Sequence, residues 1–110
     1  MASRDHLRGT LEVLILKTLT WGPRHGYAIA HWLESSSSEV LRVEEGSLYP
    51  ALYRMERRGL VKSDHRMSEL GRPAKFYQIT PAGRRHLHAE TADWLAFAHE
   101  VSRVLQADAS

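Results

Sequence analysis

Proline and glycine interrupt this 110-residue chain at four points, and the segments between them are short. Trp21-Gly22-Pro23 ends the first segment, because proline disfavours helical geometry at the residue before it. Gly59 is a common type of helix stop, Gly71-Arg72-Pro73 suits a turn, and Pro81 suits the first position of a helix. The chain is therefore predicted to form several short elements and then one long helix.

Apolar residues at helical spacing predict two helices in the first third of the chain. The second of them spans about residues 26–34, with Tyr27, Ala30 and Leu33 on one face. A loop that contains four consecutive serines follows and reaches Glu45. The first helix spans about residues 7–20, and its apolar positions are Leu7, Leu11, Leu14, Ile15 and Leu19.

The remaining segments predict a third helix, a hairpin and a long final helix. Ser47 is expected to cap the third helix, with Pro50 tolerated in its first turn and Gly59 at its end. Strand-forming runs at residues 60–63 and 75–80 flank the Gly/Pro turn and predict the hairpin. Thr80 is expected to cap the final helix, which Pro81 opens and which reaches about residue 106. This order predicts an α+β, mainly α fold: a winged helix-turn-helix over residues 1–80, then a C-terminal dimerisation helix and tail over residues 81–110.

Composition restricts the class of protein. Hydrophobic residues make up 43% and charged residues 25%, which are ordinary values for a globular chain. No apolar run approaches the ~20 residues that span a bilayer, and the chain does not begin with the apolar stretch of a secretory signal. Cysteine is absent, which excludes disulfides, thiolate nucleophiles and cysteine-ligated zinc. We expect a cytoplasmic protein without a membrane partner.

Positive charge is concentrated in one part of the chain. The net charge is only +2, but residues 46–89 hold nine Lys/Arg and three acidic residues, whereas the remainder holds six and ten. Such asymmetry is typical of a surface that binds a polyanion. A basic face that serves only solubility is the alternative reading of the charge alone.

The third predicted helix has two different faces. Leu48, Ala51, Leu52 and Met55 recur at core spacing. Side chains suited to DNA occupy the other side, because arginine can bind guanine edges or phosphates and tyrosine can donate to phosphate oxygens. A solvated face whose tyrosines assist packing is the alternative. With Arg72 and Lys75 at the hairpin turn, the predicted DNA-binding residues are Ser47, Tyr49, Pro50, Tyr53, Arg54, Arg57, Arg72 and Lys75.

The final helix has a heptad-like apolar stripe that predicts a homodimer. Packing of this stripe on the first helix of the same chain is the alternative, and both can occur together. Two copies of Trp94 on the dimer seam would offer flat faces to an aromatic or cationic small-molecule effector, although a purely structural role in the dimer fits equally well. The predicted interface residues are Leu87, Thr91, Trp94, Ala98, Val101 and Leu105.

No enzyme or metal constellation is present in the sequence. The HExxH pattern, a phosphate-cradling glycine loop and a pair of carboxylates framed for acid–base chemistry are all missing. The histidines are scattered, and on a helix His86 and His88 point in divergent directions. We expect no catalysis, no cofactor and no metal site, with the histidines at the surface: His6, His25, His31, His65, His86, His88 and His99.

Three stretches resemble the PadR family of transcriptional regulators. HGYAI at residues 25–29 is similar to the family's HGYEI. EGSLYPALYRMERRGL at residues 45–60 resembles its recognition-helix pattern, G-[ST]-LYPAL-x-RLE-x-x-G-L. GRPAKFYQITPAG at residues 71–83 resembles its wing and helix start, GRPxKYYxLTxxG. The patterns occur in the family's order and spacing within residues 7–87.

This resemblance implies a short-subclass homodimer that binds a pseudo-palindromic operator, usually as a repressor that a small molecule relieves. By position, Ser47, Tyr49, Pro50, Tyr53 and Arg54 would face DNA from the helix, with Arg72 and Lys75 on the wing. Two other functions remain open. The same face could meet an acidic protein as a winged-helix interaction module, or the dimer cavity could serve a ligand-scavenging protein.

Overall fold

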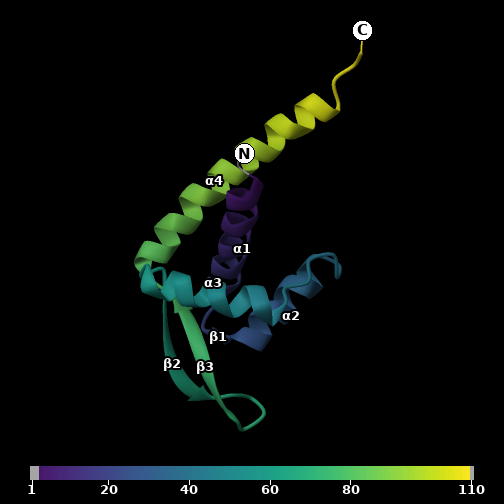
Figure 1. Ribbon diagram of the computed structural model, residues 1–110. Coiled ribbons are helices and arrows are strands. Elements are labelled where there is room, and N and C mark those ends of the chain that lie inside the picture. The colour runs from purple at the N-terminus through teal and green to yellow at the C-terminus, as the bar shows by residue number, and fades with distance from the viewer. Residues whose placement is uncertain (1–2, 110) are drawn as a thin grey trace.

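The computed structural model describes residues 3–109, in which four helices lie at one end of a small three-stranded antiparallel sheet, and the β2–β3 hairpin projects away from them (Figure 1). The predicted order of helix, helix, helix, hairpin and helix is confirmed, and a two-residue strand before the second helix is an addition to it. The elements are α1 (Ser3–Leu19), β1 (Arg24–His25), α2 (Gly26–Ser36), α3 (Glu45–Arg57), β2 (Val61–Met67), β3 (Pro73–Ile79) and α4 (Pro81–Leu105).

A single hydrophobic core joins α1, α2, α3 and the base of the sheet. Ile15 and Leu16 of α1 are fully buried there, as is Ile29 of α2. The expectation that Tyr27 shares the buried face of α2 is wrong, because Ile29 and Leu33 occupy that face and the Tyr27 ring lies in solvent. The side chain of Leu7 lies outside the described part of the chain.

Strand β3 lies in the middle of the sheet, in the order β1-β3-β2. Its pairing with β2 runs from Val61 opposite Ile79 to Met67 opposite Pro73. Both strands of this hairpin, the wing, therefore extend further toward the turn than predicted. The outer part of β2 is polar and exposed on both faces, so it lacks the alternation by which a half-buried strand is recognised. Strand β1 contributes two residues and is too short to leave a pattern.

Helix α3 begins three residues earlier than predicted. Its N-cap is Glu44, whose backbone carbonyl accepts hydrogen bonds from the amides of Ser47 and Leu48 at 3.0 and 2.9 Å. The prediction of Ser47 as the cap is therefore wrong, and Pro50 lies in the second turn instead of the first. A Glu45 carboxylate in the first turn is favourable beside the positive end of the helix.

The end of α3 matches the predicted glycine stop. Gly59 adopts a left-handed conformation (φ +75°), its amide donates to the Glu56 carbonyl, and the Leu60 amide donates to the Met55 carbonyl. This pair of bonds is a Schellman motif, which turns the chain sharply into β2. A short, hydrogen-bonded turn therefore connects α3 directly to the hairpin.

Helix α4 starts where β3 ends, as predicted. Thr80 is its N-cap, with the hydroxyl accepting from the Gly83 amide at 3.0 Å and donating to the Gly59 carbonyl at 2.6 Å. The far half of α4 extends past the N-terminal end of α1, which gives the molecule extents of 62 × 28 × 24 Å (Figure 1). None of the helices in the described range combines the length and apolar content needed to cross a bilayer.

Candidate nucleic-acid interface

The two-faced character predicted for α3 is confirmed. Its inner side consists of four core residues, and its outer side is open to solvent, with Tyr53 61% and Tyr49 43% exposed. Ser47, Pro50 and Arg57 are exposed on the same outer side. A buried back thus holds a row of hydroxyl and guanidinium groups outward, in a helix rigidly anchored by Leu48, Ala51, Leu52 and Met55.

Tyr53 and Arg57 form a pair one turn apart on this outer face. The Arg57 guanidinium donates to the Tyr53 hydroxyl at 3.4 Å, and its carbon lies 5.8 Å from the centre of the Tyr53 ring. The ring contact orients the guanidinium beside the hydroxyl and leaves its remaining donors facing solvent. This pair places an exposed cation beside a hydroxyl on the outer face of α3.

Tyr49 owes its position to a glycine in α2. A Cβ atom placed on Gly26 would lie within 2.7 Å of the Tyr49 ring, so only glycine allows the ring to lie against the α2 backbone. The contact links the sequence pattern at residues 25–29 to the helix at residues 45–57. Tyr27, exposed and stacked on His31, adds a second tyrosine beside Tyr49 that sequence spacing had assigned to the core.

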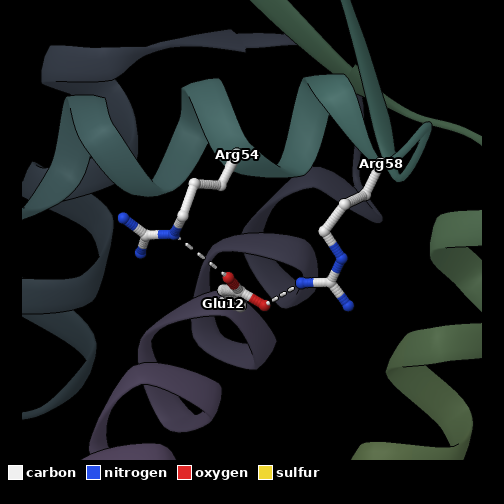
Figure 2. Close-up of polar contacts among 3 residues, drawn as sticks. All are labelled: Glu12, Arg54 and Arg58. Atoms are coloured by element: carbon white, nitrogen blue, oxygen red, sulfur yellow. Dashed lines mark hydrogen bonds and ion pairs between the residues drawn. The ribbon is translucent and has the colours of Figure 1, made fainter.

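Arg54 lies differently from its neighbours in sequence. Its side chain turns toward α1, where Nε is 3.9 Å from Oε2 of Glu12, and 37% of the side chain is exposed (Figure 2). Arg58 meets the same carboxylate at 2.9 Å through Nη1. The spacing of residues 50 and 54 had predicted an open position for Arg54, and the structure places it at the edge of the outer face instead.

The wing is attached to α3 through Glu56. Its carboxylate accepts a hydrogen bond from Ser63 of β2 at 2.7 Å and lies 3.5 Å from Nζ of Lys75 on β3. Lys75 also covers the ring of Tyr77 at 5.6 Å. Burial raises the pKa of Tyr77 above 10.0 although Lys75 acts to lower it, so the phenol is neutral at physiological pH. Lys75 is therefore held on β3 by Glu56, and 46% of its side chain remains exposed.

The wing tip presents Arg72. The Ser68 amide donates to the Arg72 carbonyl at 2.7 Å and the Gly71 amide donates to the Ser68 carbonyl at 2.9 Å, with Gly71 left-handed at φ +75°. These bonds close the turn that was predicted from Gly71-Arg72-Pro73. The Arg72 side chain is exposed on a structured tip.

The apolar stripe of α4 divides into two parts. Leu87 packs against the chain's own core, and Trp94 donates from Nε1 to the Thr10 hydroxyl of α1 at 2.9 Å. Beyond Trp94 the stripe is open, and Leu105 is 79% exposed. The first part therefore follows the intrachain alternative, while the exposure of the second part rises from 39% at Val101 to 79% at Leu105. Of the other stripe residues, Thr91 and Val101 are exposed and Ala98 is half-buried.

A hollow with apolar walls lies between α1 and α4 beside Trp94. Its volume is about 330 Å³, and Val13, Leu14, Trp94 and Leu95 are among the residues that line it. Leu41, from the loop before α3, closes one side. The space is of the size that small-molecule sites occupy, at the low end of their range.

Comparison with known proteins decides the family. The model of the transcriptional regulator PadR-like family matches residues 15–89, which include α2, α3, the wing and the start of α4. The chain belongs to the PadR family. It is accordingly a DNA-binding transcriptional regulator and not an enzyme.

Known transcriptional regulators match this chain over most of its length. A transcriptional regulator of Mycobacterium tuberculosis is 34% identical over 99 residues, which cover 89% of this chain and 88% of that protein. The crystal structure of a PadR-like transcriptional regulator from Bacillus cereus has a TM-score of 0.79 at 31% identity, with 94% of this chain and 99% of that one covered. A transcriptional regulator from Clostridium thermocellum has a TM-score of 0.80 at 27% identity, with 90% and 96% covered.

Two residues of this region were missed by sequence reasoning. Glu12 interrupts an apolar run in α1, and a lone acid at such a position was the only available signal. Glu56 was counted as one of few acids in a basic stretch, but its contacts to both wing strands could not be read from spacing.

Proposed function

We propose that this PadR-family protein is a homodimeric repressor that binds a pseudo-palindromic operator through α3 and the wing and is released by a small molecule. The outward face of α3 with Tyr49, Tyr53 and Arg57 carries the proposal, because it belongs to a helix anchored in the core and is exposed to solvent. In this role the protein would work in the cytoplasm, together with its DNA.

In the proposed complex, α3 enters the major groove. Ser47, Tyr49 and Tyr53 meet phosphates or base edges with their hydroxyls, and Pro50 contacts the groove wall. Arg57 is the principal cation of this face, and Arg54 contributes its exposed amino groups at the edge. The recognition helices of the two subunits would stand about 34 Å apart, one turn of DNA.

The wing supplies the second set of contacts. Arg72 projects from a closed turn, and an arginine so placed fits a narrow minor groove, where the negative potential is greatest. Lys75 lies two residues from the turn and meets the backbone. The ion pair between Lys75 and Glu56 fixes the wing relative to α3. A protein that contacts the major and the minor groove at once requires such a fixed arrangement.

Dimerisation is proposed through the outer half of α4. Val101 and Leu105 are exposed there one helical turn apart, and an exposed apolar stripe on a projecting helix is stabilised by a partner helix. A second copy of the chain is the proposed partner. The hollow beside Trp94 would then lie next to the subunit interface, where an apolar or aromatic effector could alter the pairing of the two subunits.

Selection from a random duplex library, followed by affinity measurement, tests the DNA-binding proposal. Arg57→Ala is expected to weaken binding of the selected duplex by about 1–3 kcal/mol if Arg57 reads a base. Arg103→Ala is the matched control, because it removes an exposed, ion-paired arginine from α4, far from α3. If each subunit neutralises about three phosphates, the slope of log affinity against log salt will be near −5.

Three outcomes oppose the proposal. One is failure to enrich any sequence. Another is a flat salt response. The third is equal loss of affinity with Arg57→Ala and Arg103→Ala, which would leave the face to an acidic protein partner instead of DNA.

A further inference from the structure

A buried carboxylate joins the first helix to the recognition helix. Glu12 is only 4% exposed, although it is charged and lies in the middle of α1. A carboxylate in such a place is strongly unfavourable unless cations and hydrogen bonds compensate it. The compensating cations are Arg54 of α3 and Arg58, the C-cap residue of the same helix, which lie one helical turn apart (Figure 2).

The two arginines are held in different ways. Arg58 makes a hydrogen-bonded ion pair with Oε1 at 2.9 Å. Arg54 Nε is 3.9 Å from Oε2, too far for a hydrogen bond, and within the described residues this buried Nε has no other acceptor. Glu12 therefore holds Arg58 by direct contact and Arg54 by charge.

Arg54 and Arg58 lie next to the outward residues Tyr53 and Arg57, which are proposed to face DNA. Residues 53 and 57 lie on the outward side, and residues 54 and 58 are each displaced from them by one residue, about 100° around the helix. Arg57 and Arg58 are adjacent in sequence, but Arg57 faces solvent with Tyr53 and Arg58 faces Glu12. Without an acid on α1, the side chains of Arg54 and Arg58 would be long, mobile cations beside Tyr53 and Arg57.

We propose that Glu12 determines DNA specificity by acting as an internal substitute for a phosphate. Its carboxylate engages Arg54 and Arg58 and withholds most of their charge from the DNA backbone. Tyr53 and Arg57, which the core residues of α3 hold outward, then meet DNA without competing phosphate contacts from these two arginines. Glu12 is a positioning residue in this proposal, which rests on the DNA-binding face described above.

Loss of Glu12 has a distinct expected signature. Arg54 and Arg58 would gain freedom to bind phosphates, and each phosphate neutralised adds about 0.9 to the salt slope. Binding to scrambled DNA should therefore strengthen more than binding to the selected duplex, because the freed arginines can contact phosphates in any register, whereas the selected duplex is bound in the one register that Tyr53 and Arg57 prefer. A variant that merely destabilises the domain would instead weaken both.

The experiment compares Glu12→Gln with wild type on the duplex selected by wild type and on a scrambled duplex of equal length and composition. We expect the affinity ratio of selected to scrambled DNA to fall at least about 10-fold, and the salt slope on scrambled DNA to steepen by about 1–2. Glu12→Asp keeps the charge and should recover part of the ratio. Glu100→Gln, which changes the net charge equally on α4, should leave both quantities as in wild type.

Arg58→Gln tests the same idea without disturbing Glu12, in case Glu12→Gln fails to fold. Because Glu12 withholds the charge of Arg58, its removal should leave the salt slope on scrambled DNA unchanged. A fall of about 1 in that slope would show that Arg58 binds phosphate freely and would overturn the proposal. An equal loss on both duplexes with folded Glu12→Gln and no change of slope would also overturn it. If wild type selects no sequence at all, the DNA-binding proposal itself fails, and that result is distinct from a failure of the role proposed for Glu12.

Discussion

At the scale of single residues, the interface depends on what each side chain is tied to, more than on what type it is. Arg54, Arg57 and Arg58 lie within five positions at the end of α3 and its C-cap, yet Arg54 and Arg58 meet Glu12 of α1 while Arg57 contacts Tyr53 on the outer face. Helical spacing alone could place residues 53 and 57 on one row. It could not reveal the acid on α1 that turns residues 54 and 58 inward, because that acid is 42 positions away along the chain from the nearer of them.

Trp94 is where the proposed effector would be detected. We expect planar aromatic compounds to quench its fluorescence and to release the selected duplex, because its ring lines the apolar hollow between α1 and α4. Trp94→Ala should abolish both effects. Trp21→Ala is the control, since Trp21 is exposed and packs against Trp32 instead.

The two indole groups that remain in Trp94→Ala also report fluorescence, so the quench must be compared across all three proteins. Absence of any response with Trp94 intact, together with monomerisation of Trp94→Ala, would assign the side chain to dimer packing alone.

At the scale of elements, the sequence was most informative where chain direction changes. Gly59, Gly71 and Thr80 were assigned correctly, because a left-handed residue and a helix cap each require particular side chains. The start of α3 was misplaced, since its cap is formed by the backbone carbonyl of Glu44 with no side-chain bond. Strand β1 was missed because two residues paired to a distant strand leave no local periodicity.

Gly83 controls how closely α4 approaches the wing. A Cβ atom there would overlap the Leu60 carbonyl oxygen and lie 2.9 Å from Cγ1 of Ile79, and a backbone carbonyl held in a helix cap cannot move aside easily. Gly83→Ala is expected to destabilise the fold by about 1–3 kcal/mol through overpacking. Thermal unfolding followed by circular dichroism measures the change.

Gly9→Ala is the matched control for that substitution. A Cβ atom on Gly9 meets nothing within 4 Å, and alanine in a helix interior is favoured over glycine by roughly 0.5–1 kcal/mol. Equal melting temperatures for the two variants would contradict the packing role assigned to Gly83.

At the scale of the whole molecule, the half of α4 beyond Trp94 leaves apolar side chains exposed, among them Val104 and Leu105. Burial against a second subunit would explain this exposure. Sequence periodicity found the stripe but could not divide it into an intrachain part near Leu87 and Trp94 and an open part beyond them. That division depends on where α1 ends in space, since α4 extends past it (Figure 1).

Val101→Asp is expected to give a folded monomer, because it places a charge in the middle of the open stripe. Sedimentation measures the oligomeric state. Affinity for the selected duplex should fall by about 100-fold or more, since the two half-sites would be bound independently.

His99→Asp makes the same change of charge on another face of α4 and should remain dimeric. A monomeric wild type, or a dimer that survives Val101→Asp, would remove this half of α4 from the interface.

The junction between β3 and α4 consists of one capping residue, Thr80, with hydrogen bonds to Gly59 and Leu60 on one side and Gly83 on the other. There is no hinge here to absorb a mismatch. In the proposed dimer, a rigid link between wing and α4 within each subunit would not stretch to suit an unfavourable half-site spacing, so the duplex would be expected to bend or twist to fit. Base pairs that no side chain touches would then contribute to operator choice through their stiffness.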